Sequence, residues 1–231
     1  LNSALIEPRL FMRHTDGEWA GYTYEWNDTQ TEATRVNGGK VADKAGQSWI
    51  YPSGSECMQC HTASANFSLG LEHGQLNSDL TYPSTGITAN QLYTADAVDL
   101  LTDPLPGTPD TLVSFAPTDD VSASLDARAR AYLHSNCAGC HRPGGPTPSN
   151  MDLRHDTDFA STGTCNVVPV SGDLGISGAT ILTPSNPSLS LLIERPSRRD
   201  AHGMPPLGST IVDSDGIQLL TDWVNSISAC P

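Results

Sequence analysis

"CAGCHRPGG", residues 137–145, is the stretch that decides how this sequence is interpreted. Two cysteines stand three positions apart, a histidine follows the second directly, and the turn-forming residues Pro and Gly come next. The stretch "CMQCH" at 57–61 repeats the same pattern, so the two pentads use four of the six cysteines in the chain. Cysteines at this spacing serve a bound metal ion, a disulfide or redox dithiol, or covalent attachment of a cofactor.

The composition limits the classes of partner. A chain of 231 residues is long enough for one large domain or two small ones. It carries 12 Lys and Arg against 26 Asp and Glu, a net charge of −14, which argues against nucleic acid or an anionic membrane surface as the partner. No apolar run approaches the roughly 20 residues needed to cross a bilayer. The stretch "LNSALIEPRL" at 1–10 lacks a basic segment followed by an apolar core, so we expect no signal peptide in it.

The chain is also unusually polar for a folded protein. Hydrophobic residues make up only 37 %, and there are 20 Gly and 17 Pro. Such a sequence either relies heavily on loops or completes its core with something other than side chains. A buried cofactor would supply the missing apolar volume.

The first half of the chain shows one clear β pattern. In "GEWAGYTYEWND" at 17–28, alternate positions are aromatic or apolar, which is typical of a half-buried strand, and turn residues stand at both ends. Together with "RLFMRH" at 9–14 this predicts a β-hairpin. A capping box from Thr88 to Gln91 predicts a short helix starting at Thr88. Four prolines in 102–120 mark the best boundary in the chain.

Helical patterns follow that boundary. We expect helices over 122–136, 186–196 and 214–227, the first of them running straight into Cys137. The predicted fold class is therefore mainly α: an all-α domain over 118–231, and an irregular α+β region with the β-hairpin over 1–110.

The pentads are the attachment signature of c-type haem. Cysteines one helical turn apart bond to the two vinyl-derived carbons at the porphyrin edge, and the adjacent histidine brings an imidazole nitrogen to the iron. A zinc ribbon usually separates its knuckles by about 15–20 residues, whereas Cys57 and Cys137 are 80 apart. Neither pentad follows a buried strand as a thioredoxin-like dithiol does. We therefore expect two haem c groups, attached at Cys57, Cys60, Cys137 and Cys140 and ligated by His61 and His141.

Cys165 and Cys230 remain. Haem attachment of this type takes place on the oxidising side of the membrane, where a leftover pair normally forms a disulfide. Such a bridge would tie the end of the chain to the loop after the second pentad; the alternative is two free thiols.

Met204 is the expected second iron ligand at the second haem. It follows His141 by 63 residues, in the proline-containing loop "AHGMPPLG" before the last predicted helix. Small single-haem cytochromes have this order of entry helix, pentad, methionine loop and closing helix, so we expect the all-α domain over 118–231 to be cytochrome c-like. His202 is the nearest rival, His155 is a weaker one, and a surface methionine in a proline-rich turn is the structural alternative.

The second ligand of the first haem is not settled by the sequence. His14 and Met12 alternate with other residues on the predicted hairpin, so they share one face and reach the iron together or not at all. His73 follows His61 by 12 residues, a separation that in small cytochromes usually falls beneath the proximal side. We favour His14 over His73 and Met12, and an open or unusual site is the remaining possibility. His134, one turn before Cys137, is expected to be structural.

Several stretches together resemble a known family. They are "EWAGYTYEWNDTQTEA", "LGLEHGQLN", "ARARAYLHSNCAGCHRPGG", "MDLR", "DLGI", "MPPLG" and "CP", and they look like a bacterial di-haem cytochrome domain. This family is found alone or fused to β-propellers similar to pyrroloquinoline-quinone-dependent sugar dehydrogenases. The resemblance covers nearly the whole chain. It implies haem positions Cys57, Cys60 and His61, then Cys137, Cys140, His141 and Met204, with Cys165 and Cys230 as a pair, and it counts against His73.

These observations predict an electron-transfer protein in the periplasm or at the cell surface of a bacterium. Its partners would be redox proteins, with a pyrroloquinoline-quinone-type sugar dehydrogenase as donor, fused or docked, and a basic acceptor for the acidic surface. The alternative is an enzyme similar to di-haem peroxidases, in which the first haem keeps an open position. A gas or redox sensor with the same open haem is a third possibility.

Overall fold

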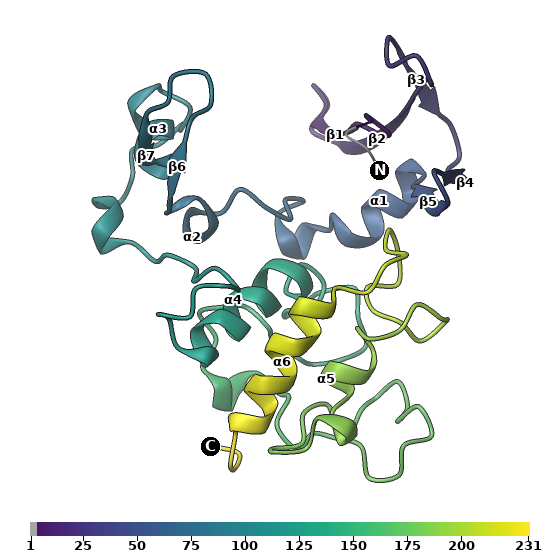
Figure 1. Cartoon of the computed structure of the whole chain (residues 1–231), viewed down its shortest axis with the longest axis vertical. Coiled ribbons are helices and arrows are strands. Elements are labelled where there is room, and N and C mark those ends of the chain that lie inside the picture. Colours follow the sequence, from purple (N-terminus) through teal and green to yellow (C-terminus); the bar gives the residue numbers. More distant parts are fainter. Residues whose placement is uncertain (1–3) are drawn as a thin grey trace.

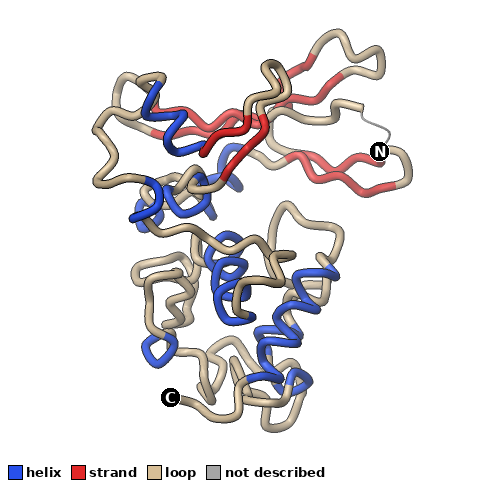
Figure 2. Tube along the Cα trace, turned by 60° about the vertical axis from the view of Figure 1, so that its left-hand side comes forward, coloured by secondary structure: helices blue, strands red, loops and turns tan. Residues whose placement is uncertain are grey.

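The computed structural model describes residues 4–231. The strands lie in the first part of this chain and the long helices in the second. All strands of these residues lie before residue 91, whereas the two longest helices come after residue 124. Figure 1 shows the strands above and the long helices below, and Figure 2 shows that much of the lower part is loop.

The β-hairpin that the sequence predicts is present. Strand β1 (Arg9–Arg13) pairs antiparallel with β2 (Trp19–Trp26), and β3 (Ala33–Val36) joins the other edge of β2. A second hairpin, β4 (Lys40–Lys44) with β5 (Gln47–Tyr51), turns through Ala45 and Gly46. Both turn residues have positive φ, 53° and 81°, which is the backbone that a two-residue hairpin loop requires.

A short helical segment crosses beneath these strands. Helix α1 (Gly54–Cys60), a 3₁₀ turn (Ala63–Ala65) and α2 (His73–Leu76) run across the top of the C-terminal part in Figure 1. Strands β6 (Asp79–Thr81) and β7 (Thr88–Asn90) and helix α3 (Gln91–Ala97) then form a separate small arm. The helix predicted to start at Thr88 starts at Gln91, because the Asn90 side chain accepts from the Tyr93 N–H and caps it.

Two long helices organise the C-terminal part. Helix α4 (Leu125–Cys137) is capped by Ser124, and α6 (Ser214–Ser226) is capped by Asp213. They pack directly on each other at Gly216, where a Cβ would lie 2.3 Å from the Tyr132 ring. The helix predicted over 186–196 is interrupted at Ser190, which separates a 3₁₀ turn (Pro187–Leu189) from α5 (Leu191–Glu194). Further 3₁₀ turns lie at Pro109–Thr111 and Phe159–Ser161.

The principal hydrophobic core lies between α4, α5, α6 and the loops around them. In residues 4–109 the buried apolar residues are Tyr51, Ala65 and Leu92. Side chains alone therefore give the strand-bearing part little core, as the polar composition suggested. The core cluster consists of Ala129, Leu133, Ala138, Leu153, Leu182, Leu192, Ile193, Leu219, Leu220, Trp223 and Val224.

The predicted mainly α fold class, with its cytochrome c-like all-α domain, is wrong. The structure is an irregular α+β fold with 26 % helix and 16 % strand. Helices α4, α5 and α6 have only 13, 4 and 13 residues, and loops joined by isolated β-bridges, such as Cys165 with Leu182, fill much of the space between them. The physical reason is the abundance of Gly and Pro, which end helical patterns soon after they begin. None of the helices in residues 4–231 has the length and apolar character that crossing a bilayer requires.

Candidate haem-attachment site

Both pentads adopt the same local turn. The His61 N–H donates to the Cys57 carbonyl at 3.0 Å, and the His141 N–H donates to the Cys137 carbonyl at 2.9 Å. Each pentad thus closes as one helical turn, which places its two cysteines and its histidine on neighbouring positions of a single turn. The first turn belongs to α1, whose N-terminus is fixed by a capping box between Ser53 and Glu56.

The His61 ring is oriented by a backbone carbonyl. Its Nδ1 lies 2.8 Å from the Phe67 carbonyl, and because a carbonyl can only accept, Nδ1 carries the proton. The lone pair is then on Nε2, which is the form that ligates a metal. Asn66 and Phe67 both have positive φ, 50° and 59°, so this carbonyl is presented by an unusual backbone.

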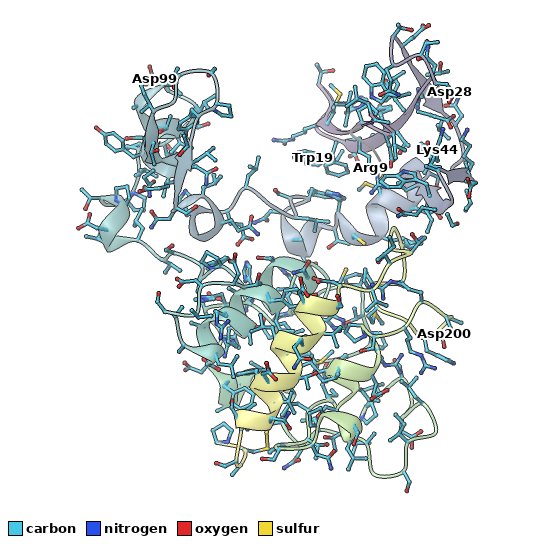
Figure 3. All side chains as sticks on the ribbon, in the orientation of Figure 1. Arg9, Trp19, Asp28, Lys44, Asp99 and Asp200 are labelled. Carbon is cyan, nitrogen blue, oxygen red and sulfur yellow. A yellow bond between two sulfur atoms is a disulfide. The ribbon has the colours of Figure 1, made fainter. Side chains whose placement is uncertain are left out.

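Aromatic side chains cover His61 from the hairpin. The Phe11 ring stacks on the His61 ring with centroids 4.0 Å apart, Trp19 stacks on Phe11 at 5.2 Å, and Phe67 stacks on Trp19 at 5.7 Å. Trp19 lies on the side of the hairpin that faces α1 (Figure 3). These rings form an apolar wall beside the first pentad.

The structure does not bring the favoured second ligands to His61. Because side chains alternate along β1, Met12 lies on the opposite face from Phe11, and it is 50 % exposed. His14 is hydrogen-bonded to Tyr22 Oη at 2.7 Å on that same outer face. The two residues do share a face, as the sequence predicts, but that face points away from the pentad. His73 is exposed at the first position of α2.

The hairpin approaches the first pentad at a glycine. A Cβ on Gly21 would lie 2.5 Å from Cys57 Sγ, a distance that only the absence of a side chain allows. Gly21 pairs with Phe11 across β1 and β2, so the same contact sets the Phe11 ring over His61.

The second pentad is the more buried of the two. Burial raises the pKa of the Cys137 thiol to about 12 and lowers the pKa of His141, which keeps the imidazole neutral. Within residues 4–231, His141 Nδ1 is buried and has no hydrogen-bond partner. A neutral buried histidine is suited to ligation, and it differs from His61 in lacking the carbonyl partner.

Two cavities meet at His141 and Met204. One, the Cys60 cavity, has a volume of about 300 Å³, and the other, the Met151 cavity, about 230 Å³. Both are lined by Cys137, His141, Pro196 and Met204. Met204 therefore lines the same space as His141, from a separate loop; its role as an iron ligand stays a prediction.

Arg199 fixes the loop that carries Met204. Its Nη1 donates to the carbonyls of Pro196 at 2.9 Å and Met204 at 3.2 Å, and its Nη2 donates to the Ile211 carbonyl at 2.7 Å. A fourth contact goes to the Arg198 carbonyl at 2.7 Å. One guanidinium thus joins the chain before, at and after Met204.

The residues present fit a haem. An apolar space of this size, a neutral histidine with a free nitrogen, a methionine lining the same space and two cysteines one turn apart are the groups that a c-type haem uses. Among the described residues, no three His, Cys, Asp or Glu side chains gather as a metal-ion cluster. Haem iron takes only two axial ligands from the protein, so its site needs no such cluster.

The two pentads lie beside each other, because Cys60 and Cys140 line the same cavity. The interaction of their thiols raises the pKa of Cys60 and lowers the pKa of Cys140. His141 lines this cavity as well. Nearby, Leu69 packs so closely on Gly139 that a Cβ there would lie 2.8 Å from it.

The remaining histidines near the second pentad have structural partners. His134 Nδ1 accepts from the His155 N–H at 2.8 Å, and His134 Nε2 lies 2.5 Å from Glu72 Oε2, so this ring connects α4 to the segment before α2. The His155 ring packs on Phe115 with centroids 4.5 Å apart. His202 is exposed, and its carbonyl accepts from Arg195 at 3.3 Å.

Cys165 and Cys230 form a disulfide with a Cα–Cα distance of 5.7 Å. The bridge joins the loop after the second pentad to the chain end beyond α6. On the chain-entropy model a closure of 65 residues stabilises the folded state by about 4 kcal/mol.

Four contributors to the site are absent from the sequence-based prediction: the Phe67 carbonyl, Arg199, Gly21 and the proximity of Cys60 to Cys140. Two of them had a signal in the sequence. "RPSRR" at 195–199 is a basic cluster in an acidic chain, and an isolated glycine within a strand pattern, as at Gly21, indicates close backbone approach.

Comparison with known proteins adds no relative: no family model, no curated protein and no solved structure matches this chain.

Proposed function

We propose that this chain is a di-haem c-type cytochrome that transfers electrons, a member of the bacterial di-haem cytochrome domain family that its sequence resembles. The observation that carries the proposal is the Cys60 cavity. Residues from three separate segments line it together: Cys137, Cys140 and His141 from one pentad, Met204 from its loop, and Cys60 from the other pentad. Neither a structural zinc site nor a dithiol needs a methionine and an apolar cavity at its cysteines.

The chain's own residues would hold the cofactor as follows. When bound, the haem supplies a one-electron iron couple. Cys57 and Cys60 anchor the first group and Cys137 and Cys140 the second, each pair on its own turn. His141 and Met204, which line the same space, would hold the second group, and the apolar lining around them would exclude water, which favours the less charged ferrous state.

The two histidines indicate the direction of transfer. A hydrogen bond from Nδ1 raises the basicity of a ligating histidine, and His61 makes one to the Phe67 carbonyl. His141 has none within the described residues, and Met204 adds a thioether. Both differences favour a lower potential at the first pentad, so electrons would pass from the first haem to the second.

The proximity of the pentads supports a direct route. The second cysteine of each pentad lines the Cys60 cavity, so the two cofactors would be attached at neighbouring points. Two hydrogen bonds join the segments that carry the pentads. His134 Nε2 lies 2.5 Å from Glu72 Oε2, and Arg142 Nη1 donates to the Ser64 carbonyl at 3.4 Å.

The setting of the proposed function is the bacterial periplasm or cell surface. A disulfide and the extracytoplasmic attachment of haem c both fit an oxidising compartment. A net charge of −14 suits a redox acceptor with a basic surface, and a pyrroloquinoline-quinone-type sugar dehydrogenase, fused or docked, is the proposed donor. Acceptor binding that is equally strong at low and high salt would contradict the charge argument.

A potentiometric titration tests the function. The protein is expressed with haem-attachment machinery and titrated while its visible spectrum is recorded. We expect two reversible one-electron steps, with the lower one lost in Cys57→Ala. A protein with no reversible step would refute the proposal.

One observation favours a second candidate, a di-haem peroxidase. Phe11 faces His61, whereas His14 and Met12 lie on the outer face of the hairpin. An iron at the first pentad would then keep a position for peroxide. High-spin iron at the first haem and peroxide-dependent turnover would support this enzyme; two low-spin haems without turnover would exclude it.

A further inference from the structure

Arg195 lines the Met151 cavity in an unusual setting for a cation. The other residues around this cavity are mainly apolar, among them Val170, Ile181 and Leu192. Among the described residues that line it, Arg195 is the one with a permanent charge. Arg195 is half-buried, so its guanidinium borders both solvent and the apolar space, where it would attract an anion.

The position of Arg195 is fixed by the backbone. Its Nη2 donates to the carbonyls of Ser171 at 2.9 Å and Gly172 at 3.1 Å, and its Nη1 donates to the His202 carbonyl at 3.3 Å. These three bonds orient the guanidinium but do not neutralise it. An arginine has five N–H donors, so two remain for another acceptor.

Two other arginines of the C-terminal part show the contrast. Arg154 pairs with Asp152 at 2.6 Å and Arg198 pairs with Asp200 at 2.9 Å. In residues 4–231 no carboxylate lies within ion-pair distance of Arg195, although the chain has more than twice as many acidic as basic residues. Arg199, on the Cys60 cavity, uses its donors on backbone carbonyls.

We infer that Arg195 binds a carboxylate of the ligand that fills the space between His141 and Met204, which for haem is one of the two propionates. A ligand with an apolar body and an anionic edge matches an apolar cavity that ends in one guanidinium, and the planar fork of arginine suits a carboxylate. This inference rests on the proposed function. It adds that Arg195 holds the potential of the second haem up, because an unpaired propionate near the iron stabilises the ferric state.

The test compares two neutralising variants that remove the same charge. Arg195→Gln removes the cation of the cavity, whereas the control Arg198→Gln removes a cation paired with Asp200, whose side chain points outward from its loop (Figure 3). We expect Arg195→Gln to shift the ferric–ferrous equilibrium of the second haem about tenfold toward ferric, or about 59 mV, with a much smaller shift in the control. Equal shifts in both variants would overturn the inference.

A second pair of variants tests the inference if Arg195→Gln fails to fold. If Arg195→Gln attaches no second haem, Arg195→Lys is compared with Arg198→Lys, since lysine keeps the charge but loses the fork. A lower potential in Arg195→Lys than in Arg198→Lys is expected, and an equal or higher one refutes the inference. The alkaline pyridine spectrum of the native protein distinguishes failure of the proposed function from failure of this inference. If the native protein carries no haem, the proposed function is refuted. If it carries two haems but substitution of Arg195 leaves the potential of the second haem unchanged, only this inference is refuted.

Discussion

Replacing Arg199 by glutamine should release Met204 from the second iron. The Arg199 guanidinium donates to the carbonyls of Pro196, Met204 and Ile211, so it connects both ends of the loop to its centre. Glutamine is too short to reach all three carbonyls and carries no charge.

The magnitude follows from the bonds that are lost. A hydrogen bond from a charged group contributes about 1.5–3 kcal/mol net to stability. When such a bond is lost in a loop, water can bond to the freed carbonyl and offset part of the lost free energy. We therefore take about 3 kcal/mol as the cost to the ordered loop, which is roughly a 100-fold change in the ratio of bound to released methionine.

The assay is the weak red absorbance band of the methionine–iron bond in the oxidised protein, followed as the temperature rises. Arg199→Gln should lose this band at a lower temperature than the native protein and lower the potential of the second haem, while both haems stay attached. Arg198→Gln, one residue away, should behave as native because its guanidinium pairs with exposed Asp200. A band and a potential unchanged in Arg199→Gln would refute the role of this arginine.

Three further predictions concern single contacts. Gly21→Ala places a Cβ against Cys57 Sγ and should cost about 1–3 kcal/mol and reduce haem attachment at the first pentad, measured as haem per chain; Gly70→Ala, with its nearest neighbour at 3.7 Å, should not. Removal of the Cys165–Cys230 disulfide by alanine substitution should lower the melting temperature by about 10 °C, and a change below about 2 °C would contradict the closure argument. The pKa of Asp152 is lowered to about 2 by its bond to Arg154, so its contribution of about 2 kcal/mol is present above about pH 4 and lost as pH falls toward 2; Asp152→Asn should remove that part of the acid dependence of unfolding.

The local turn of the pentads could be predicted because it depends on neighbours in sequence; their haem chemistry stays a prediction. A Cys-x-x-Cys-His run forms its turn locally, and both turns close with the same backbone bond. The hairpin was predictable for a similar reason, since its alternation and its turn residues lie within one stretch. Met204 needed only the order of elements along the chain, and the structure brings it to the space that His141 lines.

Other features depend on packing that a single sequence does not encode. Alternation shows that Met12 and His14 share a face, but the choice of face is made by Gly21, whose missing side chain lets β2 rest on Cys57. The mainly α prediction failed because the predicted helices cover only a small part of 118–231, and the Gly- and Pro-rich stretch 138–186 between two of them is almost entirely loop. The proximity of Cys60 to Cys140 involves residues 80 apart and had no local signal.

The number of haems attached per chain tests the central claim most directly. The native protein is purified after expression with haem-attachment machinery, and its alkaline pyridine spectrum is measured against the amount of polypeptide. We predict two haems, reduced to one when Cys137 and Cys140 are both replaced by alanine. A protein that folds and carries no covalent haem would contradict the account.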